Sequence, residues 1–204
     1  KRSEDYAHGG DELHGAGGEL RVEERRVHWP ILDAWREAAA QCGIAKIAEF
    51  NRGDNLGSAY FQVNQRRGMR WSAARAFLRP VMHRTNLSVR TGAHVHRLRI
   101  DAAARRALAV EYRDATGMQR VGARREIVMA AGAIGTPQIL QLSGIGPGTL
   151  LHGLGIPVVH DLPGVGANLH DHLQIRTVYR VHGAATLNER AGRVIGRVAM
   201  ALEY

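Results

Sequence analysis

The 204-residue chain has little cysteine, few aromatic residues and no long apolar run. Its single cysteine, Cys42, excludes an internal disulfide and fits a reducing compartment. No apolar stretch approaches the roughly 18 residues that a membrane-spanning helix needs, so we predict no transmembrane segment. Aromatic residues make up 5% of the chain and do not alternate with the arginines, which argues against base stacking and a nucleic-acid partner.

The two ends of the chain lack the features of a complete protein. The first ten residues, Lys1–Gly10, have neither an initiator methionine nor the apolar core of a signal peptide. A helical pattern that begins at Thr186 is still running at Tyr204. We therefore expect this chain to be the middle part of a longer gene product. Any targeting signal would lie upstream, so the sequence says nothing about export, and we predict a cytoplasmic location.

Arginine supplies most of the net charge of +9, and many of the arginines fall between residues 66 and 113. A basic surface can attract nucleic acid, an anionic membrane or an acidic substrate. The simpler interpretation is an arginine-rich globular protein with solvated faces, since 45% of the residues are hydrophobic and 23% are charged. We favour that interpretation and keep a non-catalytic basic domain that binds an anionic polymer as an alternative.

The apolar spacing predicts a mixed α/β (α+β) fold with an antiparallel meander in its middle. Pro30 suits the first position of a helix that Gly43 would end. The other predicted elements are a short helix from Ser72 to Leu78 stopped by Pro80, strands at Leu87–Thr91, Ala93–Ile100, Ala107–Arg113 and Thr177–Val181, a helix between Pro147 and Gly155, and a capping box at Thr186–Glu189.

The most informative stretch runs from Ala130 to Gly146. Ile127–Ala130 is apolar at every position, as expected of a buried parallel strand. Small residues follow, and Thr136-Pro137 offers an N-cap and a first-turn proline for a helix. A helix start beside the carboxyl end of a strand is where α/β sheets bind ligands. An ordinary strand–turn–helix unit with small packing residues has the same pattern, so the residues alone leave both interpretations open.

Three smaller patterns bear on binding sites. Val95 is out of step with Leu98 and Ile100, which predicts a β-bulge, and bulges are common beside sites. Two histidines flank Asp171 without a third or fourth ligand nearby, so no metal site is predicted. The stretch Gly164–Leu169 lacks the third glycine and the following helix of a dinucleotide fingerprint.

Several motifs together resemble a known family. Thr136-Pro-Gln-Ile-Leu-Gln-Leu-Ser-Gly-Ile-Gly146, after Ala-Gly-Ala-Ile, closely resembles the second signature of the glucose–methanol–choline family of FAD-dependent oxidoreductases. His14–Val22, Phe50–Leu78 and Leu154–His172 are similar to further family segments in the same order. The resemblance covers nearly the whole chain and is closest to the bacterial choline and alcohol dehydrogenase branch.

This resemblance implies a fold and an activity. It assigns residues 1–85 to part of a substrate domain and connecting segments, residues 86–172 to part of a Rossmann-like FAD-binding domain, and residues 173–204 to the start of an antiparallel-sheet substrate domain. It implies that FAD oxidises a small-molecule alcohol to an aldehyde by accepting a hydride, and that oxygen or a quinone then accepts the electrons. A lyase on the same flavin scaffold is a further alternative, because a fold does not fix a reaction.

The resemblance also implies cofactor contacts at six positions. Val95 aligns with the residue whose backbone meets the FAD adenine, and Ala131 and Gly132 align with the turn beside the adenosine. Asn168, Asp171 and His172 match a loop near the cofactor. No catalytic residue falls in this chain, and neither does a Gly-x-Gly-x-x-Gly turn, so we expect the chain alone to hold FAD weakly and to be inactive. The alcohol, the electron acceptor and the oligomeric state stay open.

Overall fold

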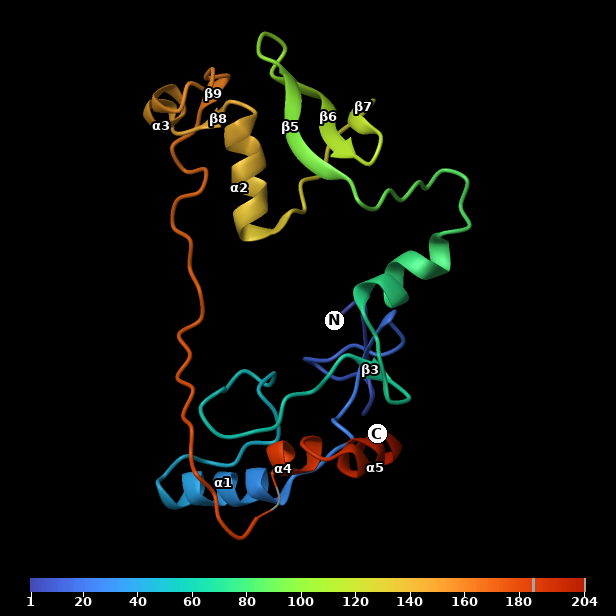
Figure 1. Ribbon diagram of the computed structural model, residues 1–204, viewed down its shortest axis with the longest axis vertical. Coiled ribbons are helices and arrows are strands. Elements are labelled where there is room, and N and C mark those ends of the chain that lie inside the picture. Colours follow the sequence, from blue (N-terminus) through green and yellow to red (C-terminus); the bar gives the residue numbers. More distant parts are fainter. Residues whose placement is uncertain (185, 204) are drawn as a thin grey trace. The chain divides into compact units, whose positions relative to one another are not determined.

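The computed structural model of the protein describes residues 1–184 and 186–203. The chain divides into two compact units, which are Lys1–Ser88 with Thr177–Tyr204 (unit 1) and Val89–Arg176 (unit 2). Both units combine short helices with small sheets (Figure 1), which confirms the predicted mixed fold. The assignment of the three ranges to substrate and FAD-binding domains stays a prediction.

Unit 2 is built around an antiparallel meander of three strands. These strands are β5 (His94–Asp101), β6 (Arg106–Asp114) and β7 (Gly117–Gly122), in the order β5-β6-β7. The register shifts between Val95 and Arg97, so the predicted bulge is confirmed. At the β6–β7 turn Gly117 has φ +113°, and the Asp114 carboxylate accepts hydrogen bonds from the backbone and hydroxyl of Thr116.

The rest of unit 2 packs beside the edge strand β5. It comprises α2 (Gly132–Leu142), β8 (Ile145–Gly146), α3 (Gly148–Gly153) and β9 (His160–Asp161), with β8 and β9 paired in parallel. The buried Ser143 hydroxyl accepts a hydrogen bond of 2.8 Å from the Leu98 N–H and donates one of 2.6 Å to the Ile139 carbonyl. One side chain therefore fixes the end of α2 against the middle of β5. Figure 1 shows α2 beside β5.

Unit 1 is held together by shorter elements. It contains the parallel pair β1 (Glu4–Tyr6) and β2 (Leu20–Val22), α1 (Pro30–Gln41), and the hairpin β3 (Gln65–Arg66) and β4 (Met69–Arg70). A π-helical turn (Ala74–Leu78), a 3₁₀ turn (Arg79–Val81), α4 (Leu187–Ala191) and α5 (Val194–Glu203) complete it. The predicted helix after Trp29 and the capping box at Thr186 are confirmed.

Three predicted strands are wrong, for one shared reason. Leu87–Thr91, Ile127–Ala130 and Thr177–Val181 have no partner strand among the described residues and form no sheet. Val128 is 78% exposed, so the burial expected of Ile127–Ala130 is missing as well. Apolar composition favours a strand, but a strand forms only where a neighbour supplies its hydrogen bonds.

One predicted helix start is also corrected. Helix α2 begins at Gly132 instead of Pro137, because Gly132, with φ +83°, turns the chain directly into the helix. The Thr136 hydroxyl accepts a hydrogen bond from the Ala131 N–H, and Pro137 lies inside the helix. The helical turn before Pro80 ends at Leu78, as predicted, and Pro80 lies in the first turn of the 3₁₀ segment that follows, where a missing N–H is tolerated.

None of the described helices is both long and apolar enough to span a bilayer.

The junction after α2 depends on a glycine. Gly144 has φ +82°, and its carbonyl accepts hydrogen bonds from the N–H groups of Val159 and His160. A Cβ at this position would lie 2.5 Å from the Pro157 carbonyl oxygen. Both the backbone conformation and the available space therefore require glycine.

We expect Gly144→Ala to lower the free energy of unfolding by more than about 2 kcal/mol, because strain and a steric clash add. Gly155→Ala is the matched control, since Gly155 has φ +69° but open space around its Cβ position. It should lose only about 1 kcal/mol, from strain alone. Urea unfolding of the two variants measures the difference, and equal losses would contradict the role of close packing at Gly144.

Candidate cofactor-binding site

A hollow of about 370 Å³ lies between the start of β5 and α2. Its walls are residues 93–96 on one side and Ala131, Gly135, Gln138, Ile139 and Leu142 on the other. The bulge places Val95 and His96 consecutively on this wall, out of the usual strand alternation. Two of the six predicted cofactor residues, Val95 and Ala131, are thus brought to one site although 36 positions separate them in the sequence.

The chemistry of this hollow suits a flat, neutral ring. Gly135 has no side chain, and a Cβ there would lie 3.2 Å from the Ala131 Cβ. Ile139 and Leu142 supply apolar surface, while Gln138 supplies an amide. The imidazole rings of His94 and His96 stand edge to face with their centroids 5.5 Å apart. An adenine ring fits such a wall, because it needs backbone hydrogen-bonding groups and apolar faces more than it needs charge.

A second hollow, of about 650 Å³, lies between another side of α2 and the loop 164–170. Asn168 lines it and has φ +56°, a left-handed conformation that asparagine tolerates better than most residues. The loop is fastened to α2 by the Gln141 side-chain amide, which donates to the Val165 carbonyl at 3.1 Å. Gln138 lines both hollows, so α2 is the wall that they share.

The remaining predicted residues lie outside these two hollows. Gly132 forms the first residue of α2, beside Ala131. Asp171 and His172 follow the loop, where the Asp171 carboxylate accepts a hydrogen bond of 2.8 Å from the His172 N–H. Both are exposed. The structure therefore groups Val95 with Ala131, keeps Asn168 on the other side of α2, and leaves cofactor contact by all six residues as a prediction.

Sequence reasoning missed a buried ion cluster in unit 1. His14 is 3% exposed and lies between two carboxylates, with Nδ1 3.1 Å from Glu4 Oε1 and Nε2 2.7 Å from Glu49 Oε1. The Tyr6 hydroxyl donates to Glu49 Oε2 at 2.7 Å, and its ring stacks on the His14 imidazole with centroids 4.1 Å apart. Arg52 Nε lies 2.9 Å from Glu49 Oε1. In the sequence, the only hint of this cluster was that a histidine, His14, begins the Gly-rich motif His14–Val22.

The cluster shifts the pKa values of its members in opposite directions. The hydrogen bond to Glu49 raises the pKa of His14, against the effect of burial, and the contact with Glu4 adds to the rise. Burial opposes ionisation of Glu49, but hydrogen bonds from Tyr6 and His14 outweigh it and lower the pKa of that carboxyl group. Burial and the neighbouring Glu49 raise the pKa of Tyr6 to about 12. Because His14 and Glu49 are buried, we assign the cluster a structural role.

This geometry predicts a loss of stability on the alkaline side. The pKa of His14 in the folded state lies above its ordinary value of about 6.5. Protonated His14 therefore contributes fully to the free energy of unfolding below about pH 6.5, and this contribution is lost as the pH rises through the raised pKa. We expect His14→Gln to lower the free energy of unfolding by about 3 kcal/mol at pH 6 and by less at pH 9. Urea unfolding at several pH values measures this. The exposed His83→Gln is the control, and a loss for His14→Gln that does not change with pH would contradict the assignment.

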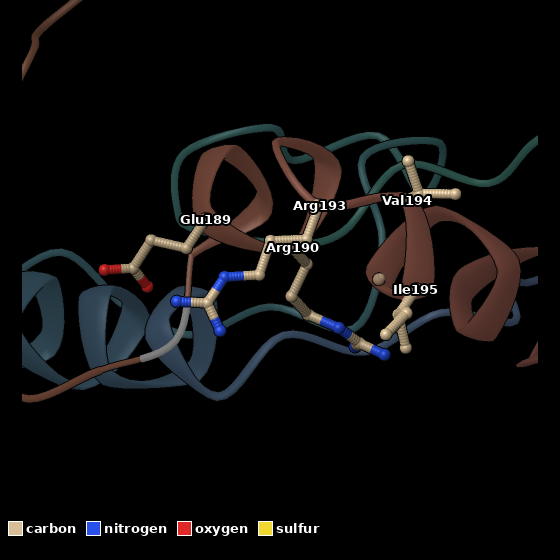
Figure 2. A pocket seen from close by; sticks show the side chains of 6 residues that line it. Glu189, Arg190, Arg193, Val194 and Ile195 are labelled. Carbon is tan, nitrogen blue, oxygen red and sulfur yellow. The ribbon is translucent and has the colours of Figure 1, made fainter.

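A third hollow, of about 820 Å³, lies in unit 1 where α4 meets α5 (Figure 2). Glu189, Arg190, Arg193, Val194 and Ile195 are the labelled side chains that line it. The Arg190 guanidinium lies over the Trp29 ring, with Cζ 5.4 Å from the ring centre. None of the six predicted cofactor residues lines this hollow, so we do not assign it to the cofactor.

Val95 on the bulged strand β5 and Ala131 at the start of α2 line one hollow, which is the candidate ligand-binding site of unit 2. The comparison with protein families identifies the class of protein: the model of the glucose–methanol–choline (GMC) oxidoreductase family matches residues 2–174. The chain belongs to the GMC oxidoreductase family.

Two curated relatives illustrate the relationship. The oxygen-dependent choline dehydrogenase of Photobacterium profundum is 36% identical over 95% of this chain and 34% of its own length. The alcohol dehydrogenase [acceptor] of Pseudomonas putida is 39% identical over 79% of this chain and 29% of its own length. The chain therefore spans about a third of the curated relatives that it matches.

Solved structures show the same fold. The pyridoxine 4-oxidase of Mesorbium loti superposes with a TM-score of 0.72 at 34% identity, covering 79% of this chain and 32% of the oxidase. An FAD-dependent oxidoreductase from Chaetomium thermophilum gives a TM-score of 0.71 at 29% identity, covering 80% of this chain and 30% of that protein. The family and these neighbours indicate FAD as the cofactor, in agreement with the sequence.

Proposed function

We propose that this chain forms the adenosine side of the FAD site in an oxidoreductase that converts a small-molecule alcohol to an aldehyde. The observation that carries the proposal is the hollow that brings Val95 and Ala131 together, in a chain of the GMC oxidoreductase family. The names of the relatives, choline dehydrogenase and alcohol dehydrogenase, support an alcohol as the substrate. The proposal names no particular alcohol, the cytoplasmic location stays a prediction, and oxygen and a quinone both stay open as acceptors.

In this proposal the residues of the chain bind and orient the cofactor. The bulged backbone at Val95 offers hydrogen-bonding groups to the adenine edge, and Ala131 and Gly135 leave room for its face. Asn168 and its loop line the other side of α2, where Gln141 holds the loop in place. Bound FAD supplies the hydride-accepting chemistry. The chain's share of catalysis is to fix the position of that group, because a misplaced cofactor loses rate steeply.

We expect Ala131→Leu to weaken FAD binding at least about ten-fold, because the larger leucine side chain fills part of the hollow and overpacking costs about 1–3 kcal/mol. The measurement is flavin retention and FAD titration of the gene product expressed from its whole reading frame. Ala115→Leu in the exposed β6–β7 turn is the control and should bind FAD normally. Unchanged affinity in Ala131→Leu would show that the adenosine lies elsewhere.

Taken alone, the 204-residue chain should carry far less than one FAD per molecule and should not oxidise alcohols. Its sequence has no Gly-x-Gly-x-x-Gly turn, so the diphosphate of FAD lacks the helix N-terminus that usually stabilises it. Visible absorbance of the purified chain and dye reduction with choline and primary alcohols test this. Stoichiometric flavin absorbance would contradict the expectation.

The same assays on the whole gene product separate the oxidoreductase from the lyase alternative. Anaerobic bleaching of the flavin by an alcohol is the expected result. Tight FAD binding without reduction by any alcohol would instead favour a lyase on the flavin scaffold.

A further inference from the structure

The arginines of the meander gather on one face of the sheet. In an antiparallel sheet, directly paired residues project to the same face, and so do alternate residues along a strand. Arg97 pairs with Glu111, and Glu111 pairs with Arg120. Arg99 lies two residues from Arg97, and Arg113 lies two residues from Glu111. We call these five residues, Arg97, Arg99, Glu111, Arg113 and Arg120, the arginine face.

The arginine face carries an excess of positive charge. Its four arginines and one glutamate give a net charge of +3. Arg97 Nε lies 2.7 Å from Glu111 Oε2, and Arg99 Nε lies 3.6 Å from Oε1. The hydrogen bond from Arg97, helped by the charges of Arg97, Arg99 and Arg120, lowers the pKa of Glu111, which therefore stays ionised. One carboxylate cannot balance four guanidinium groups.

These guanidinium groups face solvent. The side chains of Arg97 and Arg99 are 51% and 53% exposed, and Arg113 and Arg120 are exposed as well. Like charges this close on a sheet repel one another and lower stability. An anionic surface that covers the face would relieve this repulsion.

The form of the face indicates which kind of anion it meets. Sequence-tolerant binding of single-stranded RNA or DNA uses platforms of phenylalanine, tyrosine or tryptophan. In these strands the one such residue, Tyr112, is buried and lies on the face opposite the arginines. Met118 pairs with Arg113 and is exposed on the same face. Arginines with long apolar stems and an exposed methionine suit the boundary between lipid headgroups and acyl chains.

We propose that the arginine face docks the protein on an anionic phospholipid bilayer. Each arginine near such a surface strengthens binding about five-fold, so three unbalanced arginines together give about a hundred-fold preference over a neutral bilayer. Docking of this kind is peripheral and requires no membrane-spanning helix. It also requires no flavin chemistry, so its failure would leave the proposed function standing.

The test is vesicle sedimentation of the whole gene product with a triple variant, Arg99→Gln, Arg113→Gln and Arg120→Gln. This variant keeps the shorter Arg97–Glu111 ion pair and leaves the face neutral. Vesicles with roughly a third phosphatidylglycerol should bind the unaltered protein and release it at high salt, whereas phosphatidylcholine vesicles should not bind it. The triple variant should lose about a hundred-fold in binding.

Two further variants make the result decisive. Arg124→Gln, Arg125→Gln and Arg176→Gln together remove the same charge from exposed positions outside the three strands and should lose less than about five-fold. Arg99→Lys, Arg113→Lys and Arg120→Lys keep the charge and should keep binding, which also controls for folding. Equal losses in the two glutamine triples, no binding to anionic vesicles, or tighter binding to RNA than to vesicles would overturn the proposal.

Discussion

The hydrogen bonds of Ser143 are the interaction on which the arrangement of unit 2 depends. Its hydroxyl accepts from the Leu98 N–H and donates to the Ile139 carbonyl, so one atom links the edge strand β5 to the last turn of α2. Leu98 is buried beside it, so this N–H could not turn to water if the hydroxyl were lost. The same link holds α2 beside β5, and these two elements form the walls of the hollow that Val95 and Ala131 line.

Local signals predicted those elements whose causes are local. Pro30 and Gly43 bound α1, and Thr186 and Glu189 form the reciprocal cap of α4. The break in alternation at Val95 predicted the bulge, because a bulge must shift the inward and outward positions of its own strand. Each of these features depends only on residues a few positions away in the sequence.

Features that depend on distant residues could not be predicted in this way. The strand β7 begins and ends with glycine and has few apolar residues, yet it forms a strand because β6 supplies its hydrogen bonds. The apolar stretch Ile127–Ala130 forms no strand because it has no partner among the described residues. The His14 cluster includes a hydrogen bond between Tyr6 and Glu49, which are 43 positions apart. No spacing of residues in the sequence predicts it. The resemblance to a family pointed to all six candidate residues. Only the packing of β5 against α2 shows that Val95 and Ala131 line one hollow and Asn168 another.

The two faces of β5 show how one strand can serve two surfaces. Strand alternation turns Leu98 inward and Arg97 and Arg99 outward, while the bulge allows Val95 and His96 to line the hollow together. A regular strand would place only one of those two residues on the wall. The bulge therefore lets β5 place consecutive residues on the wall of the hollow, while Arg97 and Arg99 stay exposed on the arginine face.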